Sequence, residues 1–418
     1  MDRTSTWPTG MLGDVAESMK NGIYRPASIY ADDGVACLRM YNIDAGRVVW
    51  RDIKRMRLSE SEVADYQLLP GDILVNRVNS RELVGKAAVI PEGLEPVVFE
   101  SKNIRLRLDQ RKAYSKFINY QLLLNGIRHF SRNAQQVVGM ASISQKQLAD
   151  FPVVLPPVRD QERIVAEIEK QFSRLDEAVG NLKRVKANLK RYRTAVISDA
   201  IGGASLAGTV CSTPWDWHEI HELAAKESNS ITDGPFGSKL KTEHYTVSGP
   251  RVIRLQNVGD GVFVDEKAHI SPEHFASLSR HWVYPGDLVI AALGETLPRA
   301  CLVPNTLGPA IVKADCIRFK PGGQVLSKYL MYALNAVQTR RVTKARLHGV
   351  GRPRLNLGEI KSIVVPVPPL STQDVIVAEV ERRLSMADEI EAQADVSLQR
   401  TERLRRAILK RAFKGDLG

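Results

Sequence analysis

The sequence is poor in cysteine and in aromatic residues, and it contains no long apolar run. Its four cysteines, Cys37, Cys211, Cys301 and Cys316, form no C-x-x-C pair and have no histidine cluster beside them. We therefore expect buried free thiols rather than disulfides or zinc ligands. Because no apolar run approaches transmembrane length and the N-terminal MDRTSTWPTG is polar, we also expect a soluble, cytoplasmic protein.

The common motifs of catalysis are also missing. There is no G-x-x-x-x-G-K-[ST] loop, no G-x-G-x-x-G after a strand, and no Asp/Asn-Pro-Pro-aromatic stretch. Eight scattered histidines show no metal-ligand spacing. These absences argue against an ATP motor, an amino-methyltransferase and a metal enzyme, so we expect no cofactor and no metal on this chain.

Basic residues, by contrast, are in excess. The chain has 59 lysines and arginines against 47 acidic residues, which gives a formal net charge of +12 and a pI near 9.5. Such a balance favours an acidic partner, and nucleic acid is the commonest one.

The sequence contains an internal repeat. The segment PPVRDQERIVAEIE at Pro156–Glu169 returns as PPLSTQDVIVAEVE at Pro368–Glu381. Gln161 aligns with Gln373, and the difference between their numbers, 373 − 161 = 212, is the repeat offset. A Pro-Gly-Asp turn before an apolar strand is also repeated, at Asp72 and Asp287. A repeat this long predicts a pseudo-dimer within one chain, in which each copy is a mixed α and β globular part followed by a helical part.

Both helical parts carry an amphipathic stripe over about 40 residues, which is longer than typical globular helices. Two such stripes pack most economically on each other as an antiparallel coiled coil, with packing of each helix on its own domain as the alternative. Ser371 or Thr372 is a possible N-cap of the second helix. The predicted coiled-coil core consists of Ile164, Ile168, Phe172, Leu175, Leu182, Leu189, Ile376, Val380, Leu384, Leu398, Leu404 and Ile408.

In the globular parts, residues 98–108 and 311–319 alternate like strands, and residues 115–130 and 327–342 have helical patterns. After each of these helices comes a basic stretch without an acidic residue, from Arg128 to Gln136 and from Arg340 to Arg354. Basic and amide side chains on glycine-punctuated loops suit phosphate neutralisation and hydrogen bonds to base edges. We therefore predict DNA binding here.

Together these features resemble the specificity subunit of type I restriction-modification systems. The resemblance covers essentially the whole chain and includes TDGPFGSKLK at Thr232–Lys241, which has only Lys20–Tyr24 as a loose counterpart in the first half. It implies that residues 1–158 and 204–370 are target recognition domains that each read one half of an asymmetric split site on double-stranded DNA. It also implies that the helices at 159–203 and 371–418 set the spacing and dock two methyltransferase subunits.

In that family the partners carry the chemistry. The resemblance implies that S-adenosylmethionine, ATP and Mg²⁺ belong to the methyltransferase subunits and to restriction subunits, where these are present. On this chain we expect docking near Arg191, Arg193, Arg403, Arg405 and Arg406. The predicted DNA contacts are Arg39, Asn42, Arg77, Asn79, Lys86, Lys239, Lys241, Arg254, Asn257, Arg299, Arg346, Arg352 and Arg354. Those retained in both halves, such as Asn42 and Asn257, are candidates for structural or phosphate contacts.

Two other functions are compatible with the residues. Asp72 with the E-x-K triplet Glu100–Lys102 resembles a metal-dependent nuclease site, although the second copy keeps only Asp287 and the turn explains Asp72 without catalysis. A coiled-coil scaffold without specific DNA reading is the second alternative. Magnesium-dependent cleavage by the purified chain would favour the first, and weak, salt-insensitive DNA binding would favour the second.

Overall fold

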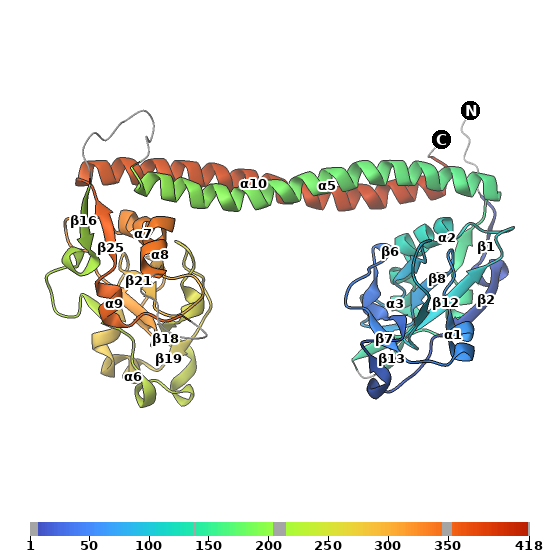
Figure 1. The fold of residues 1–418 in the computed structure, drawn as a ribbon, viewed down its shortest axis with the longest axis horizontal. Helices are drawn as coiled ribbons and strands as arrows, with labels where there is room; N and C mark the ends of the chain where they lie inside the picture. The colour runs from blue at the N-terminus through green and yellow to red at the C-terminus, as the bar shows by residue number, and fades with distance from the viewer. Residues whose placement is uncertain (1–6, 138, 204–214, 345–352, 417–418) are drawn as a thin grey trace. The chain divides into compact units, whose positions relative to one another are not determined.

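A computed structural model describes residues 7–137, 139–203, 215–344 and 353–416 (Figure 1). The chain forms two compact units: unit 1 is residues 1–182 with 396–418, and unit 2 is residues 183–395. The predicted long helices are present as α5 (Val158–Ile201) and α10 (Leu370–Lys414), so each unit contains part of both. No helix within the described ranges is long and apolar enough to cross a membrane.

Unit 1 contains a six-stranded sheet in the order β2-β12-β8-β10-β6-β5 and a four-stranded sheet in the order β11-β4-β7-β3. Two smaller sheets, β13-β14-β9 and β1-β15, complete it. The strands of this unit are β1 (Thr9–Met11), β2 (Ala16–Asn21), β3 (Tyr30–Ala31), β4 (Val35–Leu38), β5 (Ile43–Asp44), β6 (Gly46–Val48), β7 (Lys54–Met56), β8 (Ile73–Asn76), β9 (Val78–Asn79), β10 (Ala87–Val89), β11 (Val97–Phe99), β12 (Asn103–Leu108), β13 (Gln135–Val137), β14 (Met140–Ser142) and β15 (Pro152–Val154).

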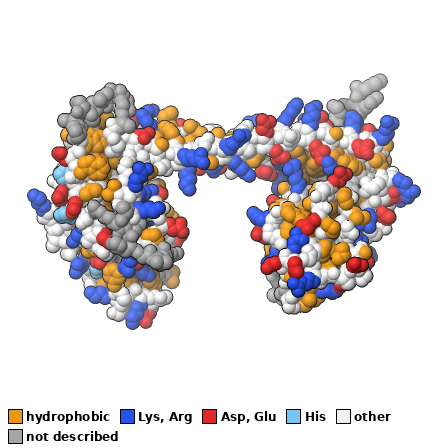
Figure 2. All heavy atoms as spheres, in the orientation of Figure 1, with side chains coloured by type: hydrophobic (Ala, Val, Ile, Leu, Met, Phe, Trp, Pro, Cys, Tyr) orange, Lys and Arg blue, Asp and Glu red, His pale blue; other side chains and the backbone are white. Residues whose placement is uncertain are grey.

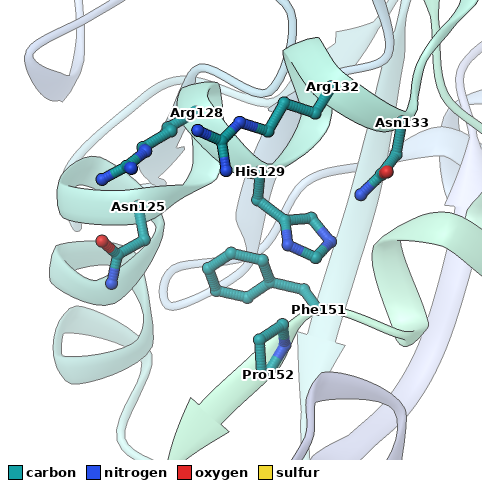
Figure 3. Close-up of a pocket in the computed structure, with 7 residues that line it drawn as sticks. All are labelled: Asn125, Arg128, His129, Arg132, Asn133, Phe151 and Pro152. Carbon is teal, nitrogen blue, oxygen red and sulfur yellow. The ribbon is translucent and has the colours of Figure 1, made fainter.

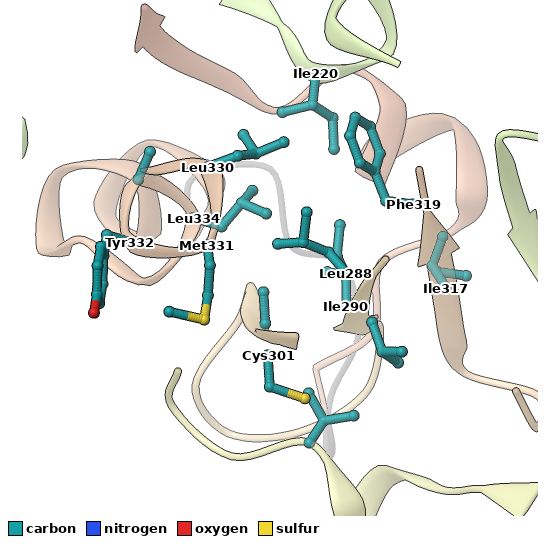
Figure 4. Close-up of a cluster of buried hydrophobic side chains, with 14 of the residues drawn as sticks. Ile220, Leu288, Ile290, Cys301, Ile317, Phe319, Leu330, Met331, Tyr332 and Leu334 are labelled. Carbon is teal, nitrogen blue, oxygen red and sulfur yellow. The ribbon is translucent and has the colours of Figure 1, made fainter. Parts of the chain in front are cut away.

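Unit 2 repeats this plan with fewer strands. Its sheets have the orders β17-β24-β21-β22, β19-β18-β23-β20 and β16-β25. The strands are β16 (Asp216–Glu219), β17 (Ile231–Asp233), β18 (Tyr245–Ile253), β19 (His269–Ile270), β20 (Trp282–Val283), β21 (Leu288–Ala291), β22 (Arg299–Leu302), β23 (Ala310–Val312), β24 (Cys316–Phe319) and β25 (Val364–Val367). Its core packs Leu288, Ile290 and Phe319 of the sheet against Leu330 and Leu334 of a helix (Figure 4).

The short helices follow the predicted pattern with interruptions. Residues 115–133 are helical throughout, but a five-residue π turn, η4 (Leu122–Gly126), separates α2 from α3. In unit 2 the matching stretch breaks at Ala336, whose backbone is extended. The remaining helices are α1 (Glu60–Tyr66), α2 (Ser115–Gln121), α3 (Ile127–Asn133), α4 (Gln145–Ala149), α6 (Pro272–Ser277), α7 (Ser327–Asn335), α8 (Val337–Lys344) and α9 (Leu357–Lys361), with 3-10 turns at 12–15, 27–29, 40–42, 220–223, 237–239, 242–244, 255–257 and 279–281.

The two predicted long strands are wrong in one respect, because each is two strands. Residues 98–108 divide into β11 and β12, and residues 311–319 divide into β23 and β24. In unit 1, β11 pairs with β4 while β12 pairs with β2 and β8, so the turn between them moves the chain from one sheet to the next. Four consecutive polar residues, Glu100–Asn103, interrupt the apolar alternation between the two strands, and the prediction of one strand passed over this interruption.

Both Pro-Gly-Asp turns are held by the same ion pair. The buried Asp72 carboxylate accepts two hydrogen bonds of 2.8 Å from the guanidinium of Arg107, and it also accepts the Leu69 N–H. In unit 2, Asp287 accepts from Arg318 Nε at 2.7 Å and from the Tyr284 N–H at 2.9 Å. The turn, the aspartate and the arginine on the neighbouring strand thus form one structural device that is present in both copies.

The repeated Pro-Pro segment fixes each long helix to its unit through a buried glutamine. Gln161 accepts the Tyr114 N–H at 2.8 Å and donates to the carbonyls of Pro156 and Lys112. Gln373, which the repeat offset aligns with Gln161, does the same with Leu326, Pro368 and Gln324. Both glutamines have no exposed surface. Because α10 begins at Leu370, the N-cap predicted at Ser371 or Thr372 is wrong, and these residues lie in its first turn.

The two long helices run antiparallel where they meet in each unit. In unit 1 Asp176 pairs with Arg405, and in unit 2 Arg193 pairs with Asp388 while Lys186 pairs with Asp395. As the residue number on α5 rises, the number of its partner on α10 falls by the same amount. The repeat offset converts the pair of Asp176 and Arg405 into the pair of Asp388 and Arg193, so the predicted internal pseudo-twofold repeat extends to single ion pairs.

The seam between the helices is less apolar than predicted. Ile164, Ile168, Phe172, Leu189, Ile376 and Val380 are buried, and Leu175, Leu182, Leu384, Leu398 and Ile408 are partly buried. The prediction is wrong for Leu404, which is 42% exposed, because the seam position beside it belongs to Arg405. Arg405 lies over the Phe172 ring, 4.8 Å from its centroid, and so contributes apolar packing as well as charge.

The alternative of packing on the domains is also partly correct. Ile164, Ile168, Leu409 and Ala412 belong to the main core of unit 1, and Val196, Ala200, Ile376 and Val380 belong to that of unit 2. The helix ends are therefore integral parts of the globular cores, and the mixed α and β fold with long paired helices is confirmed.

Candidate nucleic-acid interface

A rim of loops forms at the same place in each unit. In unit 1 it is built from the turn at Gly22, the turn at Glu100–Lys102, and the segment around Arg77. The Ile23 N–H donates to the Phe99 carbonyl, and the Arg77 N–H donates to the Lys102 carbonyl. A Cβ added to Gly22 would lie 2.2 Å from the Glu100 carbonyl oxygen, so only glycine permits this close approach.

Unit 2 builds its rim in the same way. A Cβ on Gly234 would lie 2.1 Å from the Lys313 backbone. The segment at Pro353–Leu355 joins the rim, because the Leu355 N–H donates to the Ala292 carbonyl and the Gly294 N–H donates to the Pro353 carbonyl. The repeat offset aligns Gly22 with Gly234, so the loose counterpart Lys20–Tyr24 and the Thr232–Lys241 loop occupy equivalent places.

Each rim exposes an aromatic side chain that the sequence prediction missed. Tyr24 is 76% exposed and Phe236, at the matching position, is 47% exposed. The Arg354 guanidinium lies 6.0 Å from the centre of the Phe236 ring and also pairs with Asp315 at 2.7 Å. The repeat offset aligns Tyr24 with Phe236, so the repeat contained the signal that would have found them.

Three predicted asparagine contacts are buried in their units. Asn42 donates to the Val49 and Arg51 carbonyls and accepts the Arg39 N–H, and Asn257 makes the matching bonds to Val264, Glu266 and Arg254. Asn79 donates to Asn76 at 2.9 Å. Because their amides are used inside the fold, all three positions favour a structural role, which was the alternative already open for Asn42 and Asn257 as residues present in both halves.

The predicted basic contacts divide into engaged and exposed groups. Lys86 pairs with Asp44 at 3.2 Å, Arg254 approaches Glu266 at 3.9 Å, and Arg299 donates to the Leu255 carbonyl at 3.2 Å. Arg39 and Arg77 donate to backbone carbonyls at 3.3 to 3.4 Å. Lys239, Lys241 and Arg354 are exposed on the rim of unit 2, although Lys241 also pairs with Glu243 at 3.6 Å and Arg354 with Asp315. Arg346 and Arg352 lie outside the described residues.

The arginines predicted to dock partner subunits fall into two groups, those in ion pairs within the chain and those that are exposed. Arg193 and Arg405 face the partner helix and form the seam ion pairs, so these guanidiniums are engaged within the chain. Arg191, Arg403 and Arg406 are exposed. Arg191 also lines a hollow of about 580 Å³ in unit 2 between α5 and α8, together with Val337 and Arg341. On the side of each unit that is visible in Figure 2, basic side chains are mixed with acidic ones.

The groups proposed for catalysis and metal binding have structural roles in the described ranges. The Asp72 carboxylate is held by Arg107, and Glu100 accepts the Met40 N–H at 2.8 Å, so the nuclease pattern is accounted for by structural contacts. The described residues contain no cluster of histidine, cysteine, aspartate and glutamate able to hold a metal ion. Cys37, Cys301 and Cys316 are buried free thiols, as predicted, while Cys211 lies outside the described residues. Burial raises the pKa of Cys37 to about 12.

Comparison with known proteins gives a consistent result. The family model described as "Type I restriction modification DNA specificity domain" matches residues 4–190 and 273–400. The chain is 25% identical over 343 residues to the EcoBI type I restriction enzyme specificity subunit of Escherichia coli, covering 77% of this chain and 70% of that one. It is 23% identical over 412 residues to the EcoKI specificity subunit of Escherichia coli K12, covering 92% and 83%.

Two solved structures share the fold. One, titled as the basis of complex assembly and conformational transition of a type I R-M system, has a TM-score of 0.68 at 17% identity and covers 98% of both chains. The other, the HsdS subunit of Thermoanaerobacter tengcongensis, has a TM-score of 0.56 at 15% identity and covers 99% of this chain and 97% of that one.

Proposed function

This chain belongs to the family of type I restriction modification DNA specificity domains, and we propose that it is the DNA-recognition subunit of such a system. Each globular part reads one half of a split, asymmetric DNA site. The paired helices determine the gap between the half-sites. A cytoplasmic location follows from this role.

One observation carries the proposal, namely the repetition of individual contacts at the repeat offset. Gln161 and Gln373 anchor the helices in the same way, and Gly22 and Gly234 build equivalent rims. The rims differ in their side chains, since Tyr24 and Arg25 stand where unit 2 has Phe236 and Gly237. An asymmetric split site requires two globular parts that are attached to the helices in the same way but present different side chains to the DNA.

The chemistry resides on partner chains in this proposal. Two methyltransferase subunits dock on the exposed faces of the helices and supply the S-adenosylmethionine site, and a restriction subunit, where present, supplies ATP-driven translocation and Mg²⁺-dependent cleavage. The contacts with DNA are expected from Lys239, Lys241 and Arg354 in unit 2, together with the two rim aromatic residues. No specific observation favours the nuclease or scaffold alternatives.

The first experiment is a map of modified bases in the host genome with and without this gene. We expect methyladenine to disappear from a single two-part motif with a fixed gap. Methylation that is unchanged in a host whose methyltransferase subunit is active would contradict the proposal.

A domain exchange tests the division of labour. Replacing residues 1–155 with the corresponding domain of another family member should change one half of the motif and leave the other half unchanged. A change in both halves would contradict independent reading by the two units.

A further inference from the structure

A basic hollow of about 440 Å³ opens beside α3 in unit 1 (Figure 3). It has no acidic residue in its lining, which consists of Asn125, Arg128, His129, Arg132, Asn133, Phe151 and Pro152. Most of these residues lie on one helical stretch that passes from the π turn into α3. Figure 3 shows Arg128, His129 and Arg132 projecting from the same part of this stretch.

Two cations in this hollow have no counter-ion among the described residues. Arg128 and Arg132 are exposed and one helical turn apart, and neither guanidinium forms an ion pair or hydrogen bond with any residue in the described part of the chain. Elsewhere in unit 1, Arg55, Arg57 and Arg107 are all paired with acids. Like charges at this spacing repel each other, so a bound anion would relieve an unfavourable arrangement.

The other lining groups are mostly hydrogen-bond donors suited to an oxyanion. His129 packs edge-to-face between Phe130 and Phe151, with ring centres at 5.1 and 5.2 Å. Burial lowers the pKa of His129, so its ring is a neutral donor at pH 7. The amides of Asn125 and Asn133 are on exposed residues at the two ends of the hollow. Two guanidiniums with amide and imidazole donors supply the positive charge and the hydrogen-bond donors that a phosphate group requires.

The helix that carries the hollow is connected to the rim of unit 1 through a small sheet. Helix α3 leads directly into β13, which pairs with β14, and β14 pairs with β9 next to Arg77. Arg81, which follows β9, donates to the Ser131 carbonyl of α3 at 3.1 Å. In unit 2 the equivalent of Arg128 is Arg340, and Asp260 neutralises it at 2.7 Å. The two free arginines are therefore a feature of unit 1 that the repeat does not require.

We propose that this hollow binds one backbone phosphate of the DNA duplex and so positions unit 1 without reading sequence. The inference rests on the proposed function, because it assumes that the rim of unit 1 faces DNA. Phosphate contacts position a protein on the duplex, whereas base contacts specify the sequence. The contact should therefore contribute equally on target and non-target duplexes.

The test uses the full chain with the double substitution Arg128→Gln and Arg132→Gln. Binding to a target duplex, selected from a randomised pool with the unaltered chain, is measured between about 50 and 200 mM salt. Loss of one phosphate contact should reduce the slope of log K against log salt by about 1 and weaken binding roughly tenfold near 0.1 M salt. A non-target duplex should lose affinity by the same factor.

A matched control removes charge elsewhere in unit 1. Arg111, with a side chain 90% exposed, pairs with Asp109 at 3.0 Å, and Arg111→Gln should leave the slope unchanged. Circular dichroism should show that all variants are folded, since the altered side chains are exposed. Inorganic phosphate is then titrated while the His129 imidazole signals are followed by NMR in the unaltered chain and in the double variant.

The outcomes separate this inference from the function on which it rests. An unchanged slope with target binding intact would overturn the phosphate contact and leave the DNA-recognition role standing. A changed preference between target and non-target would overturn it in favour of base reading. Phosphate-dependent shifts of His129 with an unchanged DNA slope would overturn it in favour of a free phosphate ligand. If the unaltered chain prefers no duplex at all, the proposed function fails as well.

Discussion

At the scale of single residues, the repeated glutamine has the clearest structural role. Gln373 satisfies one backbone N–H and two carbonyls at the junction between unit 2 and α10. Gln373→Ala should lower the free energy of unfolding by about 1–3 kcal/mol, because it leaves buried backbone groups without partners. Gln393, exposed on the same helix, is the control, and Gln393→Ala should stay within about 0.5 kcal/mol. Equal effects in denaturant unfolding would contradict the anchor.

A second pair of variants separates fold from DNA contact in unit 2. Asn257 is buried and holds the turn at Arg254, whereas Lys239 is exposed on the rim. Asn257→Ala should reduce stability by about 1–3 kcal/mol and leave the salt slope of DNA binding unchanged. Lys239→Ala should leave stability unchanged and reduce that slope by about 1. The reverse assignment of effects would show that Asn257 contacts DNA.

Residue type and burial explain what the sequence could predict at this scale. The buried cysteines and the structural Asp72 turn follow from local patterns. Asn42 and Asn257 could not be separated from DNA contacts, because an amide serves equally well for backbone carbonyls and for base edges. Tyr24 and Phe236 were missed because hydropathy does not distinguish an exposed aromatic residue from a buried one, and only their alignment by the repeat offset connects them.

At the scale of elements, the helix seam carries charge at positions where a coiled coil normally has apolar residues. Asp176 with Arg405 in unit 1 and Arg193 with Asp388 in unit 2 occupy equivalent places. The apolar pattern predicted both long helices but selected Leu404 instead of Arg405. The long aliphatic stem of arginine can fill a seam position that hydropathy alone assigns to leucine.

A double-mutant cycle measures the contribution of one such ion pair to the free energy of unfolding. Arg193→Ala and Asp388→Ala, alone and together, should give a coupling free energy of about 0.5 kcal/mol that falls at high salt, since the aspartate is largely exposed. Arg191→Ala with Asp388→Ala is the control cycle and should show no coupling, because Asp388 pairs with Arg193 and Arg191 is exposed away from this pair's contact. Equal coupling in both cycles would contradict a specific seam contact.

At the scale of the whole chain, the constant repeat offset separates the features that the two copies share from those in which they differ. The Pro-Pro segments, the anchoring glutamines and the seam pairs all keep this offset, while the copies differ in strand number and rim residues. The sequence therefore predicted the duplicated plan well. The division of the globular parts into several small sheets escaped prediction, because short strands that change sheets leave little periodicity.

If the helices measure the gap in the DNA site, their length should control it. Inserting four residues of high helix propensity in both α5 and α10, after Arg184 and after Val396, adds about 6 Å to each helix. The unread gap should then grow by about one to two base pairs, because successive base pairs are about 3.4 Å apart. The half-sites themselves should be unchanged, since both rims are untouched.

The modified-base map of a host that carries this variant checks both points. An insertion in α5 alone is the control, because it disturbs the paired register without lengthening both helices. An unchanged gap with intact methylation would contradict the ruler role of the helices, while altered half-sites would contradict independent mounting of the two rims.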